Sequence, residues 1–186
     1  MKILIITAPS GAGKTSITRH LMKKFPVLTF SVSAATREPR SNETEGIHYY
    51  FIPEDEFQYK IQHNEFAEWE MVYEGKYYGT LKSELSRIWD AGHVPVLDID
   101  VKGAIHVQKE FGEGALSIFI EPPSVDELKK RLHSRGTEDD ESLAARVSKA
   151  AYELSFKEHF DKTIVNSDFD EACNAAEKIV SDFLNA

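Results

Sequence analysis

The segment from Ala8 to Thr15, APSGAGKT, gathers glycines, a lysine and a threonine hydroxyl in one short stretch. It follows a continuous apolar run, residues 3–7, that is typical of a buried strand, and it opens a helical pattern over residues 15–24. Glycines at a strand-to-helix turn let backbone N–H groups surround a phosphate at the positive end of the helix. We interpret the segment as a phosphate-binding loop for a nucleoside triphosphate.

Two side chains of this loop could take part directly in phosphate chemistry. Lys14 is expected to reach the outer phosphates of ATP, and the Thr15 hydroxyl is expected to ligate Mg²⁺. The strict motif begins with glycine where this chain has Ala8, and alanine serves there provided that its φ stays negative. The residues expected to bind ATP through the loop are Ser10, Gly11, Ala12, Gly13, Lys14 and Thr15.

The charge balance excludes one class of partner. The formal net charge of -9 opposes nonspecific attraction to nucleic acid, which needs a broad basic face. Arginines nevertheless gather in two short stretches, and the planar fork of arginine suits bidentate contacts with phosphate. The candidates are Arg37 and Arg40 in the first stretch and Arg131, Arg135 and Arg146 in the second.

The number of cysteines and the length of the apolar runs indicate the cellular compartment in which the chain acts. The single cysteine, Cys173, cannot form an internal disulfide, which fits a reducing environment. The apolar run at residues 3–6 is too short for a signal peptide, and no other run is long enough to cross a membrane. We expect a cytoplasmic protein with no membrane partner.

Beyond the loop, strand and helix patterns alternate along the chain. Strands are expected at residues 28–32, 94–99, 116–120 and 163–165, with helices at 81–91, 101–110, from 124 onward, at 142–156 and at the C-terminus. Such alternation predicts one α/β domain over 1–186, with a parallel sheet flanked by helices and ligands at the carboxyl ends of the strands. Asp98 ends a strand expected beside the loop, where an acid that holds Mg²⁺ is usually found.

Two segments interrupt this alternation. Residues 33–46 are polar and aperiodic, and we interpret them as an exposed functional loop. Short aromatic strands at 48–52 and 66–73, around a helix from Pro53 to about residue 62, predict a small antiparallel lobe over about 33–80. Residues 126–156 fit a helical lid, which leaves about 1–32, 81–125 and 157–186 as the core.

Several further motifs follow the phosphate loop in a characteristic order. They are SAATREPR from Ser33, EFAEW from Glu65, YYGT from Tyr77, LDID from Leu97, RGT from Arg135 and IVN from Ile164. With these motifs, the chain resembles guanylate kinases from end to end. The resemblance implies a P-loop kinase fold with an inserted GMP-binding lobe and a lid. It also implies Mg²⁺-dependent transfer of the γ-phosphate of ATP to GMP, and to dGMP, giving ADP and GDP.

The resemblance also implies roles for individual residues. The phosphate of GMP would be bound by Arg37, Arg40, Tyr49 and Tyr78, and the guanine by Ser33, Glu68, Thr80 and Asp100. The lid arginines Arg131, Arg135 and Arg146 would close over the ATP phosphates, and Asn166 would also bind ATP. Thr80 stands where many members of the family have serine, so the hydroxyl is kept and a methyl group is added.

Elementary chemistry supports the role implied for Glu68. Guanine presents N1–H and a 2-amino group as adjacent donors, and a carboxylate can accept from both, whereas adenine has an acceptor at N1. Strand alternation alone puts Glu68 on the face of Phe66 and predicts a solvent-facing side chain. Asp100 precedes a helix and could be its N-cap, a role that guanine contact does not exclude.

Two alternative functions remain open at this point. One is a kinase for a different small phosphorylated acceptor, and the other is a noncatalytic guanylate-kinase-like interaction module. The intact Lys14 and Thr15 disfavour the module, since it has no need of an ATP site. The sequence leaves the oligomeric state undetermined.

Overall fold

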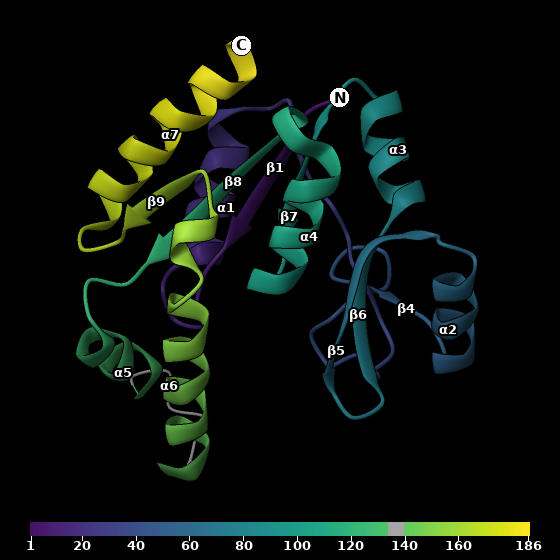
Figure 1. Cartoon of the computed structure of the whole chain (residues 1–186), viewed down its shortest axis with the longest axis horizontal. Coiled ribbons are helices and arrows are strands. Elements are labelled where there is room, and N and C mark those ends of the chain that lie inside the picture. The colour runs from purple at the N-terminus through teal and green to yellow at the C-terminus, as the bar shows by residue number, and fades with distance from the viewer. Residues whose placement is uncertain (134–139) are drawn as a thin grey trace.

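The computed structural model describes residues 1–133 and 140–186, which form two β-sheets and their covering helices (Figure 1). The larger sheet is parallel, with strand order β2-β7-β1-β8-β9. Its strands are β1 (Ile3–Thr7), β2 (Leu28–Phe30), β7 (Val94–Asp98), β8 (Ala115–Glu121) and β9 (Lys162–Val165). The predicted α/β architecture with a parallel sheet is therefore confirmed.

Helices cover both faces of this sheet because successive residues of a buried strand point to opposite sides. Leu4 and Ile6 of β1 pack in one apolar cluster with α1 (Lys14–Lys24) and α7 (Phe169–Asn185). Ile3 and Ile5 pack on the other face in a cluster with α3 (Lys82–Asp90) and α4 (Val101–Phe111). Short 3-10 turns at Gly112–Gly114 and Lys157–His159 lead into β8 and β9. Both faces of the central strand are thus buried, as its continuous apolar run predicts.

The second sheet has the order β4-β3-β6-β5. Its strands are β3 (Ala34–Ala35), β4 (Tyr50–Phe51), β5 (Phe66–Tyr73) and β6 (Lys76–Leu81), and α2 (Glu54–Gln62) packs on it through Phe57. The β5–β6 and β3–β6 pairs are antiparallel, but β3 and β4 are parallel. The predicted small antiparallel sheet is therefore confirmed, with one parallel pair at β3, a strand that lies inside the polar segment expected as loop.

Two further helices, α5 (Val125–His133) and α6 (Asp140–Leu154), lie at the opposite end of the larger sheet from the small one (Figure 1). The Ser124 hydroxyl accepts a hydrogen bond from the Glu127 backbone N–H at 3.0 Å and so caps the N-terminus of α5. Leu128, Leu132 and Ala150 form a small apolar cluster that joins the two helices.

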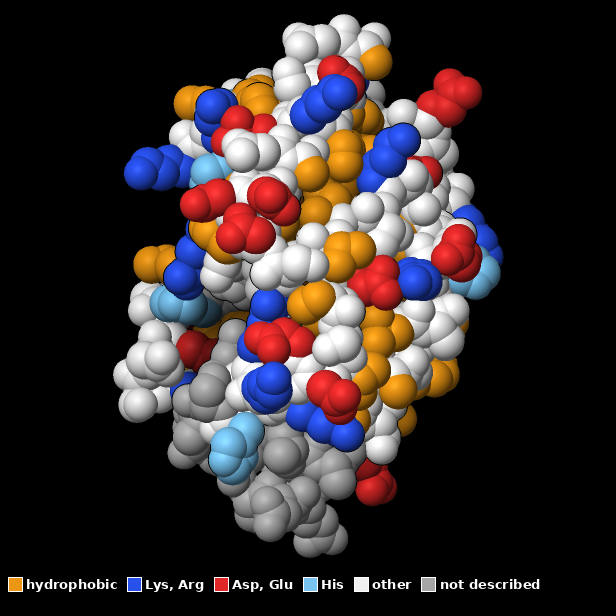
Figure 2. Space-filling view, turned by 90° about the vertical axis from the view of Figure 1, so that its left-hand side faces the viewer, with side chains coloured by type: hydrophobic (Ala, Val, Ile, Leu, Met, Phe, Trp, Pro, Cys, Tyr) orange, Lys and Arg blue, Asp and Glu red, His pale blue; other side chains and the backbone are white. Residues whose placement is uncertain are grey.

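On the face that Figure 2 shows, acidic and basic side chains are interspersed, which agrees with the argument from net charge against a broad basic face. Among the described helices, none combines the length and the apolar character that crossing a bilayer requires.

Candidate active site

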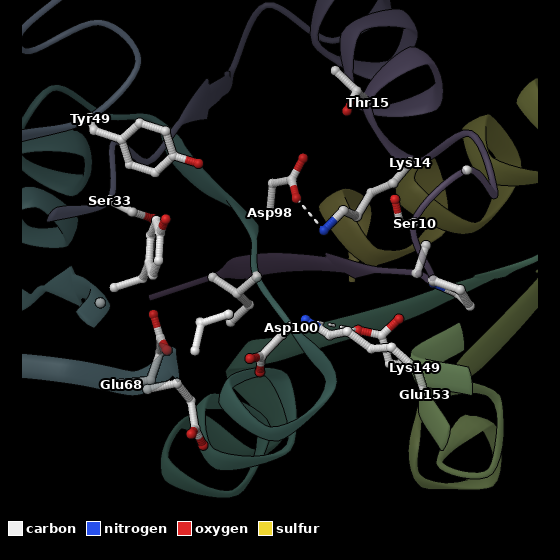
Figure 3. Close-up of a pocket in the computed structure, with 18 of the residues that line it drawn as sticks. Ser10, Lys14, Thr15, Ser33, Tyr49, Glu68, Asp98, Asp100, Lys149 and Glu153 are labelled. Atoms are coloured by element: carbon white, nitrogen blue, oxygen red, sulfur yellow. Dashed lines mark ion pairs between the residues drawn. The ribbon is translucent and has the colours of Figure 1, made fainter. Parts of the chain in front are cut away.

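A cavity of about 530 Å³ opens where the carboxyl ends of β1 and β7 face the small sheet. Segments distant in the sequence meet there: the predicted phosphate loop, residues 33–49, β5, β6 and α6 (Figure 3). The predicted site residues that line it are Ser10, Gly11, Gly13, Lys14, Thr15, Ser33, Arg37, Arg40, Tyr49, Glu68, Tyr78, Asp98 and Asp100. One cavity therefore contains residues from the predicted donor and acceptor sites.

The phosphate loop has the backbone conformation that its glycines allow. Gly13 is the N-cap of α1 with φ 101°, a left-handed conformation that favours glycine. A Cβ at Gly13 would lie 2.2 Å from the Asn166 amide nitrogen, so space as well as conformation requires glycine. Ala8 does not take a positive φ, so alanine can stand where the strict motif has its first glycine.

Asn166 and Ala12 support the loop from its buried side. The Asn166 side-chain amide donates to the Ala12 carbonyl at 2.7 Å, and both residues are buried. Neither residue is among those that line the cavity. The geometry supports a positioning role for Asn166, and its predicted contact with ATP stays a prediction.

Lys14 and Asp98 form an ion pair at the centre of the cavity (Figure 3). They are brought together by the sheet, because Ile6 of β1 is in register with Asp98 at the end of β7. About a fifth of each side chain is exposed, 22% for Lys14 and 19% for Asp98, so solvent or a ligand can reach both. Thr15 lines the same cavity, and a hydroxyl and a carboxylate oxygen suit a hard divalent cation.

Glu68 is buried, which corrects the solvent-facing position that strand alternation predicts. Phe66 pairs with Leu81 and Glu68 pairs with Thr80, so Ala67 has no residue opposite it and forms a β-bulge. The bulge turns the Glu68 side chain toward α4, where it is 7% exposed. Simple alternation could not reveal this, because a bulge reverses the face of the residues that follow it.

Burial has a strong electrostatic effect on Glu68. It raises the pKa of the carboxyl from 4.5 to about 7, the nearby Asp100 carboxylate adds to the rise, and a hydrogen bond from Thr80 opposes it. The Thr80 hydroxyl donates to Glu68 Oε1 at 2.7 Å, so Thr80 lies behind the carboxylate and does not line the cavity itself.

Asp100 caps the helix that faces Glu68. Its Oδ1 accepts from the backbone N–H groups of Lys102 and Gly103 at 3.0 and 2.9 Å, which confirms the predicted N-cap of α4. The positive end of the helix therefore lies next to both carboxylates and offsets part of their repulsion.

Arg37 is the centre of a cationic and aromatic cluster. Its Nε donates to the Tyr78 hydroxyl at 3.1 Å, and its guanidinium lies 4.9 Å from the centre of the Tyr49 ring. Its two terminal nitrogens donate to the two carboxylate oxygens of Glu43 at 2.5 and 2.6 Å. These contacts hold the pKa of Glu43 down to about 2. Arg40 donates its backbone N–H to Glu43 at 2.8 Å.

Several residues that line this cavity were not singled out from the sequence, among them the charged residues Glu43, Lys149 and Glu153. The only signal for Glu43 is an acid next to two arginines in a short loop. Lys149 and Glu153 belong to α6, and their side chains lie 4.0 Å apart and extend toward Asp100 and the phosphate loop (Figure 3). Both follow Arg146 on the same face of the helix. Charged residues at this spacing are equally typical of a solvent-exposed helix face, so the sequence alone does not identify them as site residues.

Two of the three predicted lid arginines, Arg131 and Arg146, are among the described residues and lie away from the cavity. Arg131 donates to Glu127 Oε1 at 3.3 Å and to the Asn166 carbonyl at 3.1 Å. Arg146 is exposed on α6, and neither of these two arginines lines the cavity. Arg135 lies outside the described residues. The role of all three toward ATP phosphates stays a prediction.

Comparison with known proteins places these features in a family. A family model described as "Guanylate kinase" matches residues 1–183. The guanylate kinase of Bacteroides fragilis is 46% identical over 183 residues, 98% of this chain and 90% of that protein. That of Salinibacter ruber is 44% identical over 184 residues, 99% of this chain and 97% of that protein. The crystal structure of guanylate kinase from Anaplasma phagocytophilum superposes with a TM-score of 0.77 at 32% identity, covering 97% of this chain and 84% of that one. The chain therefore belongs to the guanylate kinase family.

Proposed function

We propose that this chain transfers the γ-phosphate of ATP to GMP, and to dGMP, giving ADP and GDP. The observation that carries the proposal is one cavity that joins a phosphate loop to a buried carboxylate and an arginine–tyrosine cluster. An interaction module that binds a single phosphorylated partner has no use for both halves. Membership of the guanylate kinase family supports the same conclusion.

On the donor side, the phosphate loop and Lys14 would hold the outer phosphates of ATP. Lys14 now pairs with Asp98, and an incoming polyanion offers its ammonium group a stronger partner. Asp98 would then be released from this ion pair and could ligate Mg²⁺ together with Thr15. In the described residues, no group of three or more His, Cys, Asp or Glu could hold a metal ion. Thr15 and Asp98 would therefore hold Mg²⁺ together with phosphate oxygens.

On the acceptor side, Glu68 would recognise the guanine edge. Each carboxylate oxygen can accept two hydrogen bonds, so Oε1 can accept from Thr80 and from a guanine donor together. Adenine places a lone pair where guanine has N1–H, and a buried carboxylate facing that lone pair would stay unsatisfied. Ser33 and Asp100 also line the cavity and would complete the base site.

The phosphate of GMP would bind at Arg37, Arg40, Tyr49 and Tyr78. Glu43 now occupies the two terminal nitrogens of Arg37, so the incoming phosphate must displace this carboxylate or share the guanidinium with it. A dianionic phosphate carries more charge than a carboxylate and also accepts from the tyrosine hydroxyls, which favours displacement.

The transfer needs cations more than it needs a general base. GMP phosphate has a second pKa of about 6 and is largely dianionic at neutral pH, so one of its oxygens can attack the γ-phosphorus in line. Charge spreads over the three oxygens of the moving group, and Lys14 would neutralise part of it as ADP leaves. Mg²⁺, when bound, would supply further neutralisation between the phosphates.

We assign residues of about 33–80 to the acceptor lobe, 126–156 to the lid, and the rest to the core. Closure of the lobe and lid would bring Arg131, Arg135 and Arg146 toward the ATP phosphates and exclude water, which prevents wasteful hydrolysis. We further propose that the chain acts in the cytoplasm, on small-molecule substrates, without binding nucleic acid.

A coupled assay of ADP release tests the function directly. Purified protein is given ATP, Mg²⁺ and each of GMP, dGMP, AMP, IMP, CMP and UMP, with Lys14→Ala as the inactive control. We expect GMP to exceed AMP by about a hundredfold or more in kcat/KM. Preference for another monophosphate would overturn the base assignment, and calorimetric binding of GMP without any ADP release would favour the interaction module.

A further inference from the structure

Gly103 lies in the first turn of α4, directly opposite the Glu68 carboxylate. A Cβ built on Gly103 would lie 2.6 Å from Glu68 Oε2 and 3.2 Å from its Cδ. Contacts of a Cβ below 3.0 Å are essentially never found in proteins. The carboxylate therefore occupies the space that any other residue at position 103 would fill with its own side chain.

The backbone conformation gives no reason for glycine at this position. Gly103 is within a helix and is not among the described glycines with positive φ. Alanine is the better helix former, so glycine here weakens the helix. Close approach of Glu68 is the reason that the structure offers.

The surroundings of Glu68 limit how far it could retreat from a larger residue. Its Oε1 accepts from the Thr80 hydroxyl at 2.7 Å, and its side chain is buried. Ala67 of β5 packs in one apolar cluster with Val101 and Ala104 of α4, which fixes the separation of strand and helix. The Gly103 N–H is also held, since it donates to Asp100 Oδ1 at 2.9 Å.

We propose that Gly103 is a specificity-determining position, where the absence of a side chain sets how the Glu68 carboxylate meets the guanine edge. The proposal rests on the function proposed above. Gly103 acts through Glu68 and is a positioning residue, since it offers the base no side-chain group. Any larger residue at this position pushes Oε2 toward the cavity and removes the alignment needed to accept from two adjacent donors at once.

The consequence is a change in base discrimination without loss of the fold. IMP keeps N1–H and lacks the 2-amino group, so the GMP-to-IMP ratio of kcat/KM reports whether both carboxylate oxygens are used. Gly103→Ala should lower this ratio by about tenfold, because misplacing a buried acceptor leaves a guanine donor unpaired. The KM for ATP should not change, since the phosphate loop lies on the opposite wall of the cavity.

The experiment compares kinetics and melting temperatures of the wild type, Gly103→Ala and Lys102→Ala. Lys102 is the matched control, because it is exposed and lies in the same helical turn. We expect a lowered GMP-to-IMP ratio in Gly103→Ala alone, with a melting temperature at or near that of the wild type. If the wild type prefers GMP and Gly103→Ala has the same GMP-to-IMP ratio as the wild type, this inference is overturned and the proposed function stays intact.

A second background separates an effect through Glu68 from a general effect on the helix. In Glu68→Ala the clash is absent, so adding Gly103→Ala should change neither the ratio nor the folding. If Gly103→Ala alone fails to fold, the double variant should fold again. A double variant that stays unfolded, or that shows the full change in the ratio, would overturn the proposal. A wild type that does not phosphorylate GMP would overturn the function and the inference together.

Discussion

Replacing Glu68 with glutamine should stabilise the protein at alkaline pH while impairing recognition of GMP. Burial, with a smaller contribution from the Asp100 carboxylate, raises the pKa of Glu68 from 4.5 to about 7. The folded protein therefore holds this proton more tightly than the unfolded chain does. The resulting stabilisation is complete below pH 4.5 and is lost as pH rises through about 7.

The size of this effect follows from the gap between the two pKa values. Each pKa unit corresponds to about 1.4 kcal/mol, so the wild type should lose about 3 kcal/mol of unfolding free energy from this group between pH 4 and pH 8. Glutamine has nearly the same shape and no charge. Its carbonyl can still accept from Thr80, and its amino group can face Asp100. The Glu68→Gln variant should escape most of the loss.

Urea unfolding of the wild type and Glu68→Gln at pH 5 and pH 8 measures the difference. Glu74→Gln is the matched control, because Glu74 is exposed at the turn between β5 and β6, and it should follow the wild type. If wild type and Glu68→Gln showed the same change between the two pH values, Glu68 would ionise without cost and the argument from burial would be wrong.

The same substitution should reduce discrimination between GMP and AMP. The amide turns one acceptor oxygen into a donor, so one of the two guanine donors loses its partner. An unsatisfied buried group costs about 1–3 kcal/mol, or roughly tenfold to more than a hundredfold in the ratio of kcat/KM. Retention of wild-type discrimination would mean that Ser33 and Asp100 carry base selection.

Three further predictions concern the same cavity. Lys14→Ala should lose most turnover and stay folded, because its charge serves the transferred phosphate; near-normal turnover by a folded variant would remove the phosphate-loop assignment. Arg37→Lys should raise the KM for GMP by about tenfold with little effect on the KM for ATP, since lysine cannot replace a bidentate fork; equal effects on both constants would count against an acceptor site there. The KM for GMP should rise as pH falls below about 7, because protonated Glu68 accepts fewer hydrogen bonds; Glu68→Gln, compared over the same pH range, removes this contribution and leaves only the titration of the GMP phosphate.

The sequence by itself determined the parts of this protein that depend on neighbouring residues. The phosphate loop is one contiguous stretch between a strand and a helix, so its glycines and Lys14 can be recognised without knowing any tertiary contact. The strands and helices that the patterns predicted lie within two residues of their observed bounds. The caps of α4 and α5 were predictable for the same reason, since a cap involves residues only two or three apart.

Only the tertiary structure decided which side chains share the cavity. Glu68 is buried for two reasons. A bulge at Ala67 reverses the face that alternation assigns to it, and α4 covers it on that face. Lys149 and Glu153 reach the cavity because the fold brings α6 to the same cavity as the phosphate loop, and Glu43 reaches it because its carboxylate pairs with Arg37. The need for glycine at position 103 arises only because Glu68, on the distant strand β5, approaches it. The physical reason is that periodicity reports which face of an element is apolar, whereas register, bulges and packing between distant elements fix what that face meets.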